Sequence, residues 1–183
     1  MKNTKKAMIK SIEEIYDKLD KVSPTDYDCG ELCGEICCVY DKYNSDEEVG
    51  LYLLPGEELL YEDDDDEDFE LYYIPPDETY DYGLYLVKCI NPPHCNRDIR
   101  PIQCRTFPLI PHIENNRFHL IIDEAEFPYT CPLVHDENKL NKDFIEVTYE
   151  VWKVLIKNPA VYKLIDMDSK RRIESKDEYT IVI

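Results

Sequence analysis

Cysteine is the residue type with the most distinctive chemistry in this chain. The 183 residues include eight cysteines: a first group with the spacing C-x3-C-x3-C-C, which is Cys29, Cys33, Cys37 and Cys38, and a second group, which is Cys89, Cys95, Cys104 and Cys131. Zinc ions and iron–sulfur clusters are held by several thiolates that converge on one centre, so this clustering favours metal ligation by all eight residues. Disulfides and buried free thiols are the alternatives. We expect a cytoplasmic chain without an export signal, which argues against disulfides.

The first group cannot bind one ion from a continuous helix. A helix rises about 1.5 Å per residue, so Cys29 and Cys37 would lie about 12 Å apart along its axis. Gly30 and Gly34 allow the backbone to fold back, and we therefore expect turns here. Because adjacent side chains point in different directions, Cys37 and Cys38 would serve different ions, or one would bridge two ions, or one would be a small buried hydrophobe.

The second group is surrounded by cations, which are scarce elsewhere in the chain. They are Lys88, Arg97, Arg100 and Arg105. Four thiolates on Zn²⁺ leave a net charge of about −2, so nearby arginines would stabilise such a centre. The alternative is that they pair with the acidic surface. We also expect ligands from both groups, with at least Cys104 and Cys131 joining three of the first four cysteines.

Ligand type does not distinguish zinc from iron, but the spacing favours zinc. The first group matches neither the bacterial nor the plant ferredoxin pattern. Zinc imposes no d-electron geometry and tolerates irregular spacing, so we expect one or two zinc ions, with iron or an iron–sulfur cluster as the alternative. His94 and His135 are the plausible extra ligands, although surface or supporting roles are favoured for both, whereas His112 and His119 are expected to make ordinary core hydrogen bonds.

A resemblance to a known family rests on three stretches. They are the first cysteine group, the segment RPIQCRTFP at 100–108, and Cys131-Pro132. Together they resemble the YkgJ-type cysteine-cluster family, over roughly residues 29–133. The resemblance implies a zinc- or iron-chelating domain with eight cysteines and no agreed reaction. The family's hallmark is CxxCxxCC, whereas this chain has three residues between the first cysteines.

The elements expected around the cysteines are mostly short. An apolar stripe predicts an N-terminal helix over 4–21: Met8, Ile12, Ile15, Leu19 and Val22. Strands are expected at 49–54, 69–74, 84–90 and 117–122, with an irregular proline-rich region at 91–111. A C-terminal helix carrying Trp152 in the core should end near Lys157. Asn158-Pro159 should then open a second helix to about residue 165, and 179–183 is a last strand or a frayed tail.

These elements predict an α+β fold in which a small irregular sheet and cysteine-rich metal-bearing loops are flanked by N- and C-terminal helices. We expect a single domain over 1–183, with its core at about 29–133. The net charge is −19, which disfavours nucleic acid and anionic membranes as partners. Much of the excess lies in the acidic run at 62–68, which we expect to be a solvated loop. No segment has the apolar length of a membrane span.

Three classes of function fit this pattern. The first is a metal-binding protein whose thiolate centre holds the fold together, because four thiolates leave no open coordination position. The second is an iron–sulfur redox protein or metalloenzyme, and the third is a metal carrier or sensor. The sequence contains no phosphate-binding loop, nucleophile elbow or HExxH motif, which favours the first. The metal ion is the expected partner, and no protein partner is indicated.

Overall fold

The computed structural model describes residues 2–43, 50–61, 69–95, 97–123, 129, 131–134 and 139–183. Its class is α+β, with helices toward both ends of the chain and two small antiparallel sheets, as the sequence predicted. The acidic run at 62–68 and His135 lie outside the described residues. In the described part of the chain, no helix is both long and apolar enough to cross a membrane.

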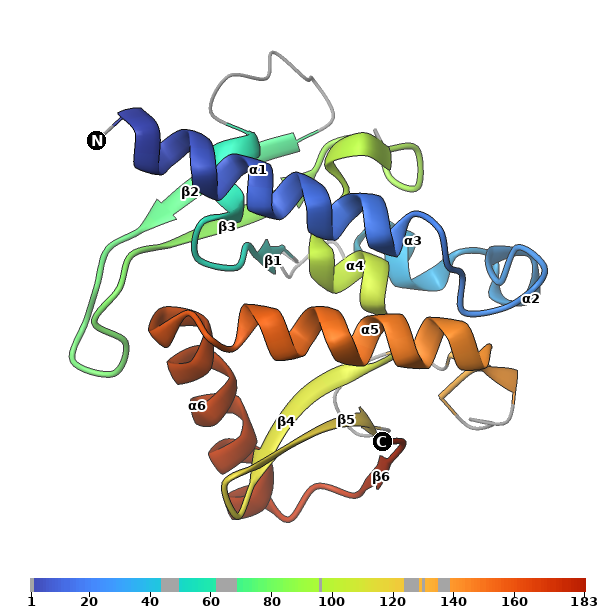
Figure 1. Ribbon diagram of the computed structural model, residues 1–183. Helices are drawn as coiled ribbons and strands as arrows, with labels where there is room; N and C mark the ends of the chain where they lie inside the picture. The colour runs from blue at the N-terminus through green and yellow to red at the C-terminus, as the bar shows by residue number, and fades with distance from the viewer. Residues whose placement is uncertain are drawn as a thin grey trace. The chain divides into compact units, whose positions relative to one another are not determined.

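The chain forms two compact units, and each unit draws on separate stretches of the sequence. Unit 1 contains Met1–Lys18 and Cys38–Arg105, whereas unit 2 contains Leu19–Cys37 and Thr106–Ile183. Each unit has one of the two three-stranded sheets (Figure 1). The expectation of a single domain over 1–183 stays a prediction.

Unit 1 is built on a sheet with the strand order β1-β3-β2. Its elements are α1 (Lys2–Leu19, shared at its last residue with unit 2), most of α3 (Ile36–Tyr43), β1 (Leu51–Tyr52), η1 (Glu57–Leu60), β2 (Phe69–Ile74), β3 (Leu84–Cys89), η2 (Arg97–Ile99) and α4 (Ile102–Thr106). All three strands had been predicted near these positions. Strand β2 pairs with β3 from Phe69↔Cys89 to Ile74↔Leu84, and the sheet buries Phe69 and Val87 against Leu53 and Tyr61.

The apolar stripe predicted for the N-terminal helix is confirmed over the part of the helix that packs in the core. Ile12, Ile15 and Leu19 are buried, whereas Met8 is 40% exposed. The helix packs on the turn before η1, where Gly56 has a positive φ of 104°. A Cβ atom at Gly56 would lie 3.3 Å from the Met8 side chain, so the glycine serves both the turn and the close approach of the helix.

Unit 2 contains the sheet β4-β5-β6 and the two long C-terminal helices. Its elements are α2 (Gly30–Cys33), β4 (Ile110–Glu114), β5 (Arg117–Asp123), α5 (Lys142–Leu155), α6 (Pro159–Ser175) and β6 (Tyr179–Ile181). Strands β4 and β5 form a hairpin whose turn residues, Asn115 and Asn116, both have positive φ values, a conformation that asparagine tolerates well. Trp152 is buried, as predicted.

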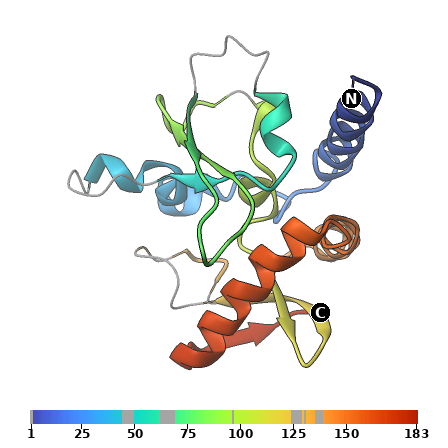
Figure 2. The same ribbon diagram turned by 90° about the vertical axis from the view of Figure 1, so that its left-hand side faces the viewer.

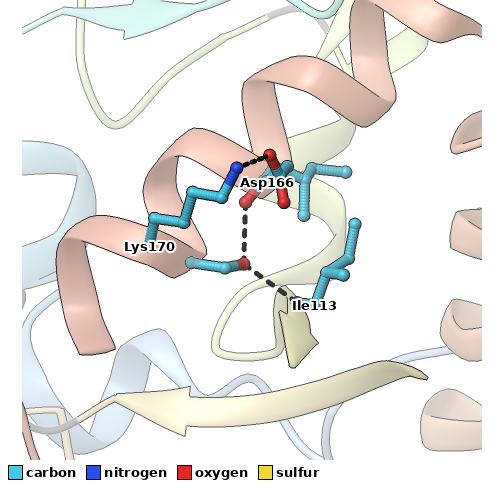
Figure 3. A network of polar contacts seen from close by, with 5 residues as sticks. Ile113, Asp166 and Lys170 are labelled. Atoms are coloured by element: carbon cyan, nitrogen blue, oxygen red, sulfur yellow. Dashed lines mark hydrogen bonds and ion pairs between the residues drawn. The ribbon is translucent and has the colours of Figure 1, made fainter. Parts of the chain in front are cut away.

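Helices α5 and α6 pack on this sheet (Figures 1 and 2). Asn158 caps α6 by accepting a hydrogen bond from Ala160 N at 3.0 Å, with Pro159 at the first position, as predicted. Figure 3 shows how one turn of α6 is tied to β4: Ile113 N donates to Ser169 Oγ at 2.9 Å, and Ser169 Oγ donates to Ile165 O at 2.7 Å. On the same helix, Lys170 pairs with Asp166 at 2.6 Å.

Buried polar groups lie where α6 meets the sheet. Arg172 Nε donates to Asp123 Oδ2 at 2.9 Å, and both side chains are at most 2% exposed. His112 is also fully buried, and its ring lies 4.7 Å from that of Tyr179. Neither His112 ring nitrogen has a hydrogen-bond partner among the described residues, so the expectation of an ordinary core hydrogen bond is wrong for this histidine.

Burial lowers the pKa of His112 below its usual value. Arg172 and His119 lower this pKa further, whereas Glu114 and Asp123 raise it. The native protein therefore holds His112 neutral at a pH where the unfolded chain, with an ordinary histidine pKa of about 6.5, binds a proton. The unfolded state gains this proton as the pH falls through about 6.5, so folding stability is lost in that direction.

We expect His112→Phe to reduce acid sensitivity, because phenylalanine does not titrate. Between pH 6.5 and the lowered pKa of His112, wild type should lose up to about 1.4 kcal/mol of unfolding free energy per pH unit more than the variant. Urea titrations followed by Trp152 fluorescence measure this difference. Parallel slopes for wild type and His112→Phe would contradict a neutral buried His112.

Candidate functional site

The two units divide the eight cysteines into sets of four. Unit 1 contains Cys38, Cys89, Cys95 and Cys104, and unit 2 contains Cys29, Cys33, Cys37 and Cys131. All eight lie among the described residues, and none of them forms a disulfide there. The boundary runs between the adjacent residues Cys37 and Cys38, so the spatial sets differ from the groups along the sequence by an exchange of Cys38 for Cys131.

A short, interrupted backbone carries the first cysteines of unit 2. Cys29 precedes α2 and Cys33 ends it, with the Cys33 thiol 3.9 Å from Cys29 O. Gly34 and Glu35 then adopt φ values of 65° and 58°, which stops this helix before α3 begins at Ile36. The predicted fold-back at the glycines is thus confirmed at Gly34, although Cys37 and Cys38 lie in a helix and not in a turn.

Cys131 joins this segment from about 100 residues downstream. It is buried, and its carbonyl accepts a hydrogen bond from Val134 N at 3.0 Å. Desolvation raises the pKa of Cys29, and Asp28, Cys131 and Cys33 raise it further. Desolvation and Cys33 likewise raise the pKa of Cys131. Cys29, Cys33 and Cys131 therefore lie close enough for their charges to interact.

The unit 1 set comes from four different segments. Cys38 lies in α3, Cys89 ends β3, Cys95 follows in the next loop and Cys104 lies in α4. Desolvation raises the pKa of Cys104, as do Cys89 and Cys38, whereas Arg100 lowers it. Cys104 is an exposed residue, so its neighbouring thiols contribute more to this rise in pKa than desolvation does. Three thiols of unit 1 thus interact electrostatically.

Arg100 connects the fourth thiol, Cys95, to two of the other three, Cys38 and Cys104. Its Nε donates to Cys95 Sγ at 3.3 Å. Desolvation lowers the pKa of Arg100, but the hydrogen bond to Cys95 and the charges of Cys95, Cys38 and Cys104 outweigh it and raise that pKa. The predicted cation near the second cysteine group is therefore a direct contact in the case of Arg100.

Arg105 holds backbone near the same thiols. Its Nε donates to Arg100 O at 2.6 Å, and its Nη2 donates to Arg97 O. Its guanidinium also lies 4.1 Å from the centre of the Tyr16 ring. Arg105 thereby holds the loop that carries Arg100, while its own guanidinium stacks on Tyr16 of α1.

A buried glutamate supports the helix that carries Cys104. Glu57 is 1% exposed and accepts three hydrogen bonds, from Tyr16 Oη at 2.6 Å, Ile102 N at 2.6 Å and Leu54 N at 3.0 Å. Burial raises the pKa of Glu57, and these donors and Arg105 oppose the rise. Ile102 is the first residue of α4, so Glu57 caps the helix that bears Cys104.

The sequence analysis missed Glu57 and Tyr16. Forty acidic residues and fifteen tyrosines offer no local signal that singles out one buried pair. Only the meeting of α1, η1 and α4 places Tyr16 Oη against the Glu57 carboxylate.

Cys29, Cys33 and Cys131 interact in unit 2, and the four thiols of unit 1 interact with one another or with Arg100, but in the described part of the chain neither set forms a complete coordination sphere. Among the described residues, no three His, Cys, Asp or Glu side chains converge closely enough to hold a metal ion. His94 lies beside Cys95 and is exposed. Ligation by the eight cysteines therefore stays a prediction.

The comparisons with known proteins add no relative. No protein-family model, curated protein or solved structure matches the chain. The resemblance to the YkgJ-type family therefore stays a prediction. The chemistry of the site is inferred from the residues of this chain alone.

We expect Glu57→Gln to destabilise unit 1 by about 1–3 kcal/mol, because the amide can accept only at one oxygen and places a buried donor opposite other donors. Tyr16→Phe, which removes one donor, should cost about 1 kcal/mol. Chemical denaturation of the full chain measures both. Glu78→Gln is the matched control, because Glu78 is exposed and the charge change is the same. Equal stability of Glu57→Gln and Glu78→Gln would contradict the supporting role.

Proposed function

We propose that this chain is a metal-binding protein with two thiolate centres, one in each compact unit, whose main role is to hold each unit together. The observation that supports this most directly is the division of the eight cysteines into four and four. Four thiolates match the ligand number of a structural zinc site. This division supports, among the alternatives for Cys37 and Cys38, the proposal that each serves a different ion.

Zinc is the metal that this site favours. A four-thiolate zinc centre carries a net charge of about −2 and needs a cation or hydrogen-bond donors around it. In unit 1, Arg100 supplies a positive charge and a hydrogen-bond donor to Cys95, and its charge also acts on Cys38 and Cys104. Iron or an iron–sulfur cluster is the alternative, because thiolates suit both metals.

A structural role agrees with the small hydrophobic cluster beside the sheet of unit 1. The core of the unit 1 sheet consists of four buried side chains, Leu53, Tyr61, Phe69 and Val87. Its cysteines lie 66 residues apart from first to last, at positions 38 and 104, so a shared ion would close a long loop. Metal binding would then contribute directly to folding.

A carrier or sensor is the second candidate, and one observation favours it. Cys38, Cys89 and Cys104 are exposed in unit 1, and Cys37 is exposed in unit 2. Exposed thiolates let a competing ligand attack the metal, which speeds exchange. We place either role in a reducing compartment such as the cytoplasm, because a thiolate centre needs cysteines that are kept reduced.

Elemental analysis of protein purified without oxygen tests the metal. We expect two zinc ions per chain and a colourless solution. Cys104→Ser should remove the ion of unit 1, and Cys33→Ser should remove that of unit 2, each leaving about one ion bound. Ser11→Ala, an exposed change on α1, should leave both ions in place. Protein without metal, or variants that keep both ions, would contradict the proposal, and a brown sample with iron and sulfide would replace zinc by a cluster.

Metal removal separates scaffold from carrier. If the metals are structural, verified chelation should lower the melting temperature by on the order of 10 °C, because metal binding supplies several kcal/mol of folding free energy. Thermal unfolding followed by circular dichroism measures the change. An unchanged melting temperature together with transfer of zinc to a chromophoric chelator within seconds would favour the carrier.

A further inference from the structure

A groove of about 670 Å³ lies in unit 2, at a distance along the chain from every cysteine. Strand β5, the C-terminal half of α5 with the residues after it, and the start of α6 line it. Its side chains are mainly cationic or aromatic: Arg117, Lys153, Lys157, Phe118, Tyr149 and Tyr162. None of the metal chemistry proposed above uses these residues.

The charge of the groove is opposite to that of the chain. The protein carries a net charge of −19 and has 21 lysines and arginines, yet three of them line this one groove. Lys153 is neutralised by Glu150 at 3.0 Å. Within the described ranges, Arg117 and Lys157 form no ion pair. Glu114, which is opposite Arg117 in the hairpin, bonds Tyr179 instead.

The aromatic side chains provide flat surfaces beside these charges. The rings of Phe118 and Tyr149 are stacked, with centroids 5.3 Å apart and an interplanar angle of 26°. Lys153 Nζ lies 5.2 Å from the centre of the Tyr149 ring. Tyr162 is 41% exposed, so part of its ring is available to a ligand. Such surfaces stack with planar rings and tolerate many of them.

We propose that this groove binds a small aromatic phosphate monoester of the nucleoside monophosphate type. Arg117 and Lys157 supply two positive charges without an ion-pair partner in the described part of the chain, and these match the two negative charges of a phosphate monoester. Tyr149 and Tyr162 supply the surface for the ring, and the volume is in the usual range for a small ligand, about 300–1,000 Å³. A long nucleic acid would also meet the acidic field of the rest of the chain, so a small anion is favoured.

Isothermal titration of the full chain tests this with adenosine 5′-monophosphate, adenosine and inorganic phosphate. The monophosphate should bind with a dissociation constant in the micromolar to low millimolar range, at least tenfold tighter than either fragment. Arg117→Gln and Lys157→Gln should each weaken it about tenfold, the usual size for a lost charge-assisted hydrogen bond. Lys170→Gln is the matched control, because Lys170 is exposed, pairs with Asp166 and lies outside the groove.

Further variants assign the ring and check the fold. Tyr162→Ala should weaken the monophosphate and adenosine alike. Circular dichroism should be unchanged in every variant, because Arg117, Lys157 and Tyr162 are exposed. Absence of saturable binding below 10 mM, which corresponds to a binding free energy of about −2.7 kcal/mol, would overturn the proposal. Equal effects of Arg117→Gln and Lys170→Gln would also overturn it. Equal affinities for adenosine and the monophosphate, or for phosphate and the monophosphate, would also overturn it.

Discussion

A carboxylate that folding removes from water must receive hydrogen bonds, and in unit 1 this requirement joins three elements at Glu57. Its donors come from Tyr16 in α1, Leu54 before η1 and Ile102 at the start of α4. Because α4 carries Cys104, the same three bonds that satisfy Glu57 also set the position of one thiol. Arg105 extends the arrangement, since it stacks on Tyr16 and holds the carbonyl of Arg100, whose guanidinium contacts Cys95.

Unit 2 meets the same constraint with a different pair. Asp123 and Arg172 are buried against each other, and Ser169 bonds the backbone of β4 from the same helix. His112, by contrast, is buried without a partner for its ring nitrogens among the described residues. Replacing a buried ion pair by apolar residues is often neutral for stability, so the pair is better understood as fixing the register of α6 on the sheet. The acid sensitivity of this unit follows from the histidine beside it.

Several elements were predictable because their local signals agree. The stripe of α1, the strands β2 and β3 with their Tyr, Leu, Ile and Val content, and the Asn158-Pro159 start of α6 all appear where the sequence predicts them. The end of α6 was not predictable: the expected helix stopped near residue 165, but α6 continues to Ser175. Beyond residue 165, the buried positions of α6 are the polar residues Ser169 and Arg172. Because these positions are not apolar, the sequence shows no helical hydrophobic periodicity there. Strand β4 was missed because Pro111 and His112 resemble loop residues, and an edge strand tolerates both.

The sequence by itself determined the chemistry that this protein can offer: eight thiols, a few cations near the later ones, and a glycine, Gly34, that ends a helix between Cys29 and Cys37. Only the tertiary structure decided which thiols are neighbours. Cys131 lies in the same unit as Cys29 and Cys33, and Cys38 in the same unit as Cys89 and Cys104, because each unit draws on segments far apart in the chain. Tertiary structure likewise gathered Arg117, Lys157 and three aromatic rings into one groove. The spacing of residues along the chain carries no information about these long-range contacts, because they depend on how helices and sheets pack.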